Sequence, residues 1–313
     1  MKLTVRCRSG LRIDFEGSLE ELERFDGFLA ELARLERDRL APAPHDAIGA
    51  AVASPRVIGA QARAAMSAQL AERHGAHHAQ ALALAARMRG IPAYIVMPDN
   101  APQVKKDAVA GYGGQISFCA PTLEAREATL RRVYEQIGAN VVHPYNDERV
   151  IAGQGTAAVE LLDSVPELDA VIAPVGGGGL LSGTSIATKG LKPGIRVIAA
   201  EPEMADDAWR SMKEGRIIPS QNPKTIADGL LTSLGTLTFP IIQQNVEQIV
   251  TVSEQGIIEA MKFVWERAKI VIEPSAAVAV GVLWEKKIDL RGLKVGIILS
   301  GGNVDLNKLP WQQ

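Results

Sequence analysis

The sequence predicts an α/β protein built on an open, parallel, twisted sheet with helices on both faces. From His78 onward, short apolar strands alternate with helical stretches of ten or more residues, as in right-handed βαβ units. Four consecutive glycines, Gly176–Gly179, follow a strongly apolar strand. Further polar clusters follow strands near Glu201 and Ser300. Since ligands bind beyond the carboxyl ends of parallel strands, these clusters can converge.

The expected elements are justified by apolar runs for the strands and by capping residues for the helices. Strands are expected at 93–97, 115–120, 140–143, 171–175, 196–200, 248–252 and 294–299. Helices are expected at 79–88, after 98–100, from 122, at 149–162, at 180–192, at 253–269 and at 274–285. This order predicts two lobes in a chain of 313 residues.

The first 77 residues have a different character. Residues 1–44 predict an N-terminal extension with strands at 3–7 and 11–15, a helix from a Ser18–Glu21 capping box, and a proline-containing linker. Residues 45–77 are rich in Ala, Arg, His and Gln. Within them, 55–70 would form a helix by propensity, although its apolar face is thin.

Composition excludes several classes of partner. Apolar residues make up 47% and charged residues 22%, which is usual for a globular enzyme. The net charge of −2, without a long basic run, argues against binding to nucleic acid or to an anionic membrane. No apolar run of membrane-spanning length and no signal-like start is present, and two cysteines give no disulfide framework. We expect a cytoplasmic enzyme.

The glycine run predicts an anion site. A strand, a glycine turn and a helix start bring several backbone N–H groups around one point, next to the positive end of the helix dipole. Glycine lets this backbone approach a ligand closely, as in other phosphate sites. The alternative is a tight turn that binds nothing. Four consecutive glycines lose much backbone entropy on folding, a cost that a plain turn would avoid. The run matches neither G-x-G-x-x-G nor G-x-x-x-x-G-K-[ST], so a dinucleotide or a nucleoside triphosphate is not the first expectation.

Eight stretches in order resemble the fold-type-II pyridoxal-phosphate enzymes, and most of all the serine/threonine dehydratase and serine racemase group. They are 78–98, 143–147, 151–156, 174–179, 200–207, 225–229, 272–275 and 299–305. The resemblance covers about 78–308 and implies a tryptophan synthase β-like fold, with 78–145 as a small α/β lobe and 146–313 as the large lobe that binds the cofactor phosphate. Because residues 1–77 do not match, the small lobe is expected to be atypical or incomplete.

The resemblance implies specific roles in cofactor binding. Gly176, Gly177, Gly178 and Gly179 would hold the phosphate of pyridoxal 5′-phosphate. Ser300 would give a hydroxyl to the pyridine nitrogen, Asn303 would lie in the same loop, and Glu273 would approach the ring edge, although a carboxylate at a helix start is an equal alternative for it. A neutral hydroxyl makes the cofactor a weaker electron sink, which suits elimination and racemisation. Tyr145 and Asn146 lie at a strand end near the site, where the match to the family is looser.

The resemblance also implies a divalent-cation site. Glu201, the carbonyl of Ala205 and Asp207 match such a site in racemase-like members. Two carboxylates and a carbonyl are hard oxygen ligands that suit Mg²⁺ or Ca²⁺. The alternative is a solvated acidic loop, and the sequence leaves both interpretations open.

The sequence departs from the family at its catalytic lysine. The family carries this lysine upstream of a Ser-Ser-Gly-Asn-His loop, but no lysine lies between Lys2 and Lys105, and the loop position reads His74-Gly75-Ala76-His77-His78. We therefore assign no catalytic residue. The three loop histidines are expected at the surface, although they could titrate near neutral pH. Lys105 and Lys106 begin another helix and are expected to be solvated.

Two hypotheses follow. The first is a pyridoxal-phosphate-dependent serine/threonine ammonia-lyase or serine racemase-like homodimer acting on a small hydroxy amino acid, with activity limited by the missing lysine. The second is a relative without turnover that keeps only phosphate-ligand binding. A replaced or misread 5′ coding region, a chimera, or a paralogue that lost catalysis would each explain the break at His77.

Overall fold

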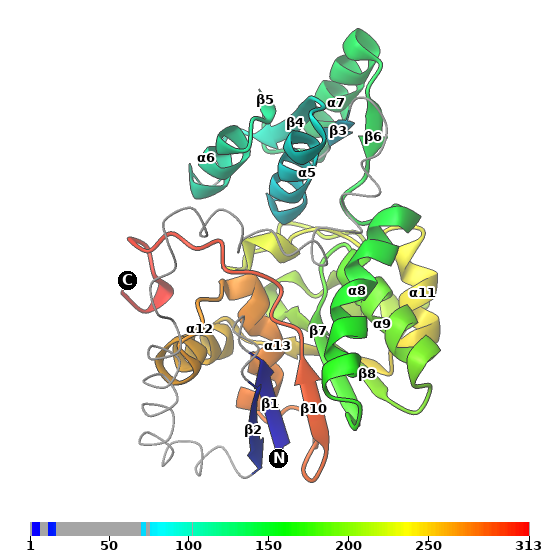
Figure 1. The fold of residues 1–313 in the computed structure, drawn as a ribbon, viewed down its shortest axis with the longest axis vertical. Coiled ribbons are helices and arrows are strands. Elements are labelled where there is room, and N and C mark those ends of the chain that lie inside the picture. The colour runs from blue at the N-terminus through cyan, green and yellow to red at the C-terminus, as the bar shows by residue number, and fades with distance from the viewer. Residues whose placement is uncertain (1, 7–11, 17–69, 73–75, 102, 313) are drawn as a thin grey trace.

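The molecule consists of two sheets with their helices, stacked one above the other (Figure 1). The computed structural model describes residues 2–6, 12–16, 70–72, 76–101 and 103–312. The larger sheet has six strands in the order β2-β1-β10-β7-β8-β9, and the smaller has four in the order β5-β4-β3-β6. The predicted α/β class with parallel strands is confirmed, and the strands form two separate sheets.

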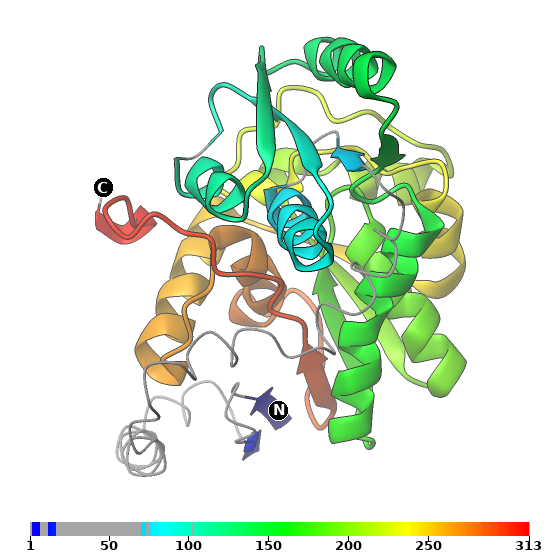
Figure 2. The same ribbon diagram turned by 45° about the horizontal axis from the view of Figure 1, so that its top comes forward.

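The larger sheet is parallel except at one edge. Its strands are β1 (Lys2–Arg6), β2 (Arg12–Glu16), β7 (Ala170–Pro174), β8 (Arg196–Pro202), β9 (Gln248–Val252) and β10 (Lys294–Ile297). The N-terminal hairpin expected at 3–7 and 11–15 forms as β1 and β2, and β1 continues the sheet by pairing parallel to β10. Figures 1 and 2 show this hairpin at the end of the molecule away from the smaller sheet.

Alternating side chains of β7, β8 and β9 build a core on each face of the larger sheet. Ile172, Ile198 and Val252 belong to the cluster that includes residues of α12 and α13. Ala173 and Ala199 belong to the opposite cluster, with residues of α9 and α11. Because both faces are buried, these strands are continuous apolar runs, and their positions could be predicted from the sequence.

The helices around the larger sheet connect its strands and cover both faces. They are α8 (Glu148–Ser164), α9 (Gly179–Leu191), α10 (Asp207–Glu214), α11 (Thr238–Asn245), α12 (Glu254–Phe263) and α13 (Pro274–Trp284), with short turns at η2 (Glu203–Ala205), η3 (Asp228–Leu230), η4 (Val264–Ala268) and η5 (Pro310–Gln312). The helix expected at 253–269 continues from α12 into the π-helical segment η4, which ends at Lys269 with a left-handed φ of 56°. Within the described residues, no helix has the length and apolarity needed to cross a membrane.

The smaller sheet is wholly parallel. Its strands are β3 (Leu70–Glu72), β4 (Ala93–Pro98), β5 (Gln115–Cys119) and β6 (Asn140–Val142), packed with α5 (Ala76–Arg89), α6 (Gln103–Gly111) and α7 (Leu123–Ile137). β3 pairs with both β4 and β6, so the expectation of a helix reaching Leu70 is wrong at its end, because pairing on both sides overrides the local helix propensity. The helices expected over 18–35 and 55–69 lie outside the described residues.

Candidate active site

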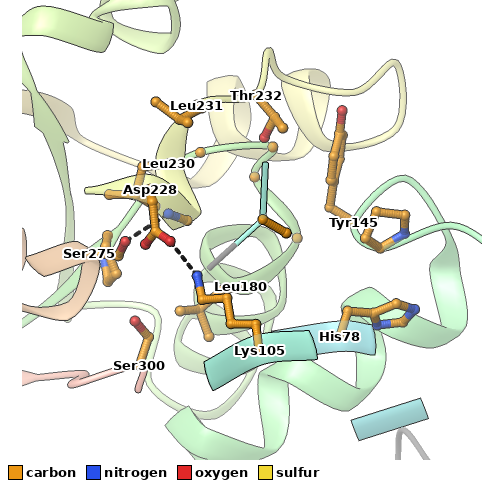
Figure 3. A pocket seen from close by; sticks show the side chains of 18 of the residues that line it. His78, Lys105, Tyr145, Leu180, Asp228, Leu230, Leu231, Thr232, Ser275 and Ser300 are labelled. Carbon is orange, nitrogen blue, oxygen red and sulfur yellow. Dashed lines mark hydrogen bonds and ion pairs between the residues drawn. The ribbon is translucent and has the colours of Figure 1, made fainter. Parts of the chain in front are cut away.

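A cavity of about 470 Å³ lies between the two lobes, within the usual range of small-molecule sites. Its walls come from both lobes: His78, Lys105 and Arg126 from the smaller one, and the glycine run, Asp228–Thr232 and Ser300 from the larger one. Figure 3 shows Lys105, Asp228, Ser275 and Ser300 around the same space. Four of the predicted site positions, Gly176–Gly179, line it, as do Ser300 and Glu273.

The glycine cradle, Gly176–Gly179, joins β7 to α9. Gly178 is the N-cap of α9 and has a φ of 89°, a left-handed conformation that glycine adopts without strain. The hydroxyl of Thr238 donates to the carbonyl of Gly177 over 2.8 Å and accepts from the N–H of Gly235 over 2.8 Å. The hydrogen bond from Thr238 to the Gly177 carbonyl fixes the orientation of the Gly177 peptide. The first N–H groups of α9 have no acceptor within the helix, so they can serve an anion.

No side chain would fit at the cradle. A Cβ atom at Gly177 would lie 2.3 Å from Cδ1 of Tyr145, and one at Gly178 would lie 2.8 Å from Thr238. At Gly179 it would lie 2.9 Å from the Tyr145 backbone. These distances are shorter than any carbon contact, so the close packing of the loop explains the glycines.

Tyr145 and Asn146 take different positions. Tyr145 lines the cavity, and its ring meets that of His143 edge to face, with the centroids 4.6 Å apart. Asn146 instead connects the segment to the loop before α11: its Oδ1 accepts from the N–H of Leu237 over 2.8 Å, and its Nδ2 donates to Thr236 over 3.1 Å. Nδ1 of His143 accepts from the N–H of Asn146 over 2.9 Å, which fixes the turn that presents Tyr145.

Ser300 and Glu273 lie on the wall formed after β10. The backbone N–H of Glu273 donates to the carbonyl of Gly301 over 3.0 Å, which holds the start of α13 against this loop. The Glu273 side chain is fully buried. Asn303 is half-buried in the same loop and is not among the lining residues, so the structure does not bring it to the cavity with Ser300.

Lys105 forms an ion pair across the two lobes. Its Nζ lies 2.5 Å from Oδ2 of Asp228, and its side chain is only 2% exposed. The expectation that Lys105 is solvated is therefore wrong, because position 105 falls with Val109 on the buried face of α6. Lys106, on the next position, is half-buried, donates to the carbonyl of Asp99 over 2.5 Å and does not line the cavity.

His78 is buried at the cavity wall, so its expected surface position is wrong. Burial, reinforced by the neighbouring His143, lowers the pKa of His78 to about 4, while the Val142 backbone and Asp147 act in the opposite direction. The imidazole is therefore neutral at pH 7. His74 and the side chain of His77 lie outside the described residues.

Glu201 and Asp207 form a buried acidic pair outside the cavity. Burial raises the pKa of Glu201 to about 9 against the hydrogen bonds that its carboxylate accepts from the N–H groups of Ala208 and Trp209, each over 2.7 Å. Burial likewise raises the pKa of Asp207 to about 6, and its Oδ2 accepts no hydrogen bond from the described residues. Ala205 is buried beside them in η2. This is not a solvated loop: an oxygen with no hydrogen-bond donor and two desolvated carboxyl groups suit a hard divalent cation.

Comparison with known proteins identifies the family. The sequence profile described as "Pyridoxal-phosphate dependent enzyme" matches residues 49–301. The chain belongs to this family. The match begins at residue 49, whereas the motifs recognised in the sequence begin only at His78.

Individual relatives agree on the group within the family. The chain is 52% identical over 235 residues to the β-hydroxyaspartate dehydratase of Paracoccus denitrificans, covering 75% of each chain. It is 50% identical to the serine racemase of Dictyostelium discoideum, covering 74% of this chain and 73% of that one. Maize serine racemase superposes with a TM-score of 0.76 at 42% identity, covering 82% and 81% of the two chains. The predicted resemblance to the dehydratase and racemase group is confirmed.

The cavity residues of this pyridoxal-phosphate enzyme fit the cofactor. The cradle has backbone N–H groups that suit a phosphate, and the hydroxyl residue Ser300 lines the same cavity. Sequence reasoning assigned no role to Asp228, Ser275, Arg126 or Thr232, which also line it. Ser275 accepts a hydrogen bond from the N–H of Gly229 over 2.9 Å. Asp228 and Ser275 lie in two of the recognised motifs, which is the signal that could have found them.

Proposed function

We propose that the chain is a pyridoxal-phosphate-dependent ammonia-lyase or racemase acting on small hydroxy amino acids. One observation carries the proposal: the glycine cradle and Ser300 open into the same cavity between the lobes. Pyridoxal phosphate supplies an electron sink for negative charge that develops at the Cα of an amino acid. The chain's own residues position this group, with the cradle holding the phosphate and Ser300 meeting the ring nitrogen.

The hydroxyl of Ser300 favours elimination and racemisation over reactions that need a stronger electron sink. A serine hydroxyl does not force the ring nitrogen to stay protonated, as a carboxylate would. Glu273, buried on the same wall, approaches the ring in this assignment. His78 lines the same cavity as a neutral imidazole, because burial lowers its pKa to about 4.

Arg126 favours a substrate with a second carboxylate. It is half-buried on α7 and lines the cavity, where a guanidinium can bind a carboxylate through charge-assisted hydrogen bonds. A 3-hydroxyaspartate therefore suits the cavity better than serine or threonine. The β-hydroxyaspartate dehydratase of Paracoccus denitrificans, at 52% identity, supports this choice.

Glu201, the Ala205 carbonyl and Asp207 are proposed to hold Mg²⁺ or Ca²⁺. The cation would compensate two buried carboxyl groups and would supply a partner for Oδ2 of Asp207. Glu201 lies near the end of β8, and its carboxylate caps the first turn of α10. The cation would therefore stabilise the junction between β8 and α10.

A homodimer is also proposed, supported by the exposed apolar side chains Val159, Ile186 and Leu191 on the adjoining helices α8 and α9.

The proposal is tested with the purified full chain, pyridoxal phosphate and Mg²⁺. Each of L-serine, L-threonine and 3-hydroxyaspartate is added, and release of ammonia with the matching 2-oxo acid is followed with a coupled dehydrogenase. Chiral chromatography measures the D-enantiomers. A 2-oxo acid or a D-amino acid supports the proposal. Cofactor binding without any product would leave the rival hypothesis, a binding protein without turnover.

A further inference from the structure

His143 follows β6 and begins the turn that leads to α8, at the junction between the two lobes. Its Nδ1 accepts two backbone hydrogen bonds within this turn, from the N–H of Tyr145 over 3.3 Å and from that of Asn146 over 2.9 Å. Its ring also meets the Tyr145 ring edge to face. One side chain therefore sets the conformation of two consecutive residues.

Both of these residues lead to the same peptide of the glycine cradle. The Tyr145 ring is so close to Gly177 that a Cβ there would lie 2.3 Å from Cδ1. On the other side, Oδ1 of Asn146 accepts from the N–H of Leu237 over 2.8 Å. The next residue, Thr238, donates its hydroxyl to the Gly177 carbonyl over 2.8 Å. The turn thus reaches the Gly177 peptide by two routes, one through packing and one through hydrogen bonds.

We propose that His143 is a positioning residue that sets the affinity of the cradle for a phosphorylated ligand, and that it acts only as a neutral imidazole. This inference rests on the proposed function, because the ligand is taken to be a phosphorylated pyridoxal compound. A ring nitrogen that accepts N–H groups carries no proton, so the proton of the neutral ring is on Nε2. Protonation of Nδ1 turns the acceptor into a donor, and both N–H groups lose their partner. The turn then relaxes, and binding must restore it at a cost in affinity.

Besides Tyr145, two elements bring titratable or charged groups to this part of the molecule. From α5 comes His78, which lies on the same side of the cavity as Tyr145 (Figure 3) and whose pKa burial lowers to about 4. From the start of α8 comes Asp147, whose two carboxylate oxygens accept from Arg149 over 3.0 and 2.7 Å. This hydrogen bonding holds the pKa of Asp147 below its ordinary value. Neither His78 nor Asp147 therefore changes charge between about pH 8 and pH 5.5, the interval in which histidines commonly titrate.

The role is tested by binding of pyridoxine 5′-phosphate to the full chain, followed by ligand fluorescence. This compound has no aldehyde, so imine formation does not contribute. His143→Leu removes the acceptor, and at about pH 8 its affinity should fall by about tenfold, the effect of one or two lost hydrogen bonds. His143→Asn keeps a side-chain oxygen that can accept N–H groups slightly further along the chain, and it should regain most of this affinity.

The pH profile separates positioning from a general effect on folding. In acid, the affinity of the native chain should fall by up to about tenfold per pH unit relative to that of His143→Asn, which has no imidazole to protonate. The ligand phosphate titrates in both experiments, so the ratio of the two affinities isolates the histidine. A ratio that is constant from about pH 8 to pH 5.5 overturns the proposal, as does full affinity in His143→Leu.

Ser253→Ala is the matched control. Ser253 likewise accepts a backbone hydrogen bond at a turn, from the N–H of Gly256 over 3.0 Å, but it is not among the residues that line the cavity. Its loss should lower the unfolding midpoint and leave affinity unchanged. Equal affinity losses in Ser253→Ala and His143→Leu would reduce the effect to stability and contradict the proposal. If the native chain binds no pyridoxine 5′-phosphate, the proposed function fails as well; if it binds but His143→Leu binds equally, only the role of His143 is wrong.

Discussion

Gly177 and Tyr145 approach each other so closely that no side chain fits between them: a Cβ at Gly177 would lie 2.3 to 2.5 Å from three ring carbons of Tyr145. Gly177→Ala must therefore displace either the ring or the loop. We expect affinity for pyridoxal phosphate to fall by about tenfold or more, about 1.4 kcal/mol, because the N–H groups of the cradle no longer converge. Titration followed by cofactor fluorescence measures this loss.

Gly190→Ala is the matched control for this prediction. Gly190 is an exposed glycine of α9, the helix that follows the cradle, and a Cβ there would meet no atom within 4 Å. Alanine should stabilise α9 by roughly 1 kcal/mol through its helix propensity and leave cofactor affinity unchanged. Equal affinity losses in the two variants would show that the crowding at Tyr145 is irrelevant to binding.

Arg126→Gln tests substrate choice. If the guanidinium binds a second carboxylate, the variant should lose about 1.5–3 kcal/mol of transition-state stabilisation for 3-hydroxyaspartate, which is measured as a lower kcat/KM. The kcat/KM for L-serine should change little. Arg131→Gln removes an exposed arginine on the same helix, α7, and should affect neither substrate. A parallel loss for both substrates in Arg126→Gln would assign the residue a structural role instead.

Divalent cations should stabilise the native chain. At a Mg²⁺ concentration about 100 times its dissociation constant, binding to the folded state adds about 2.7 kcal/mol, which differential scanning calorimetry detects as a higher unfolding midpoint. Asp207→Asn should lose this increase because it removes a ligand charge. Asp163→Asn, an exposed change on α8, should retain it. An unchanged Mg²⁺ response in Asp207→Asn would exclude this site.

The strands of the larger sheet could be predicted because burial on both faces leaves continuous apolar runs such as Val171–Val175. Non-local pairing could not be predicted. Leu70–Glu72 has helix-forming residues and only three positions, yet it becomes the strand between β4 and β6. The pairing of β1 with β10 joins segments almost 300 residues apart, and no local pattern encodes it.

Part of the site was visible in the sequence because glycines mark backbone conformation directly. Gly176–Gly179 were found in this way, whereas Ser300 was assigned through the resemblance of 299–305 to a family motif. Lys105 was missed because its partner Asp228 is 123 residues away. Its position four residues before the buried Val109 was the available signal, since such spacing puts both on one helix face.

The buried His78 should make stability fall in mild acid. Its pKa is about 4 in the folded chain against 6.5 as the ordinary value, so the unfolded chain binds the proton more tightly. The contribution is present above pH 6.5 and is lost as the pH falls toward 4; between pH 7 and pH 5 this group should cost about 2 kcal/mol. His78→Gln cannot titrate, so its free energy of unfolding, measured by urea denaturation, should depend less on pH by that amount. Identical pH dependence in the two proteins would mean that the pKa of His78 is the same in the folded and the unfolded chain.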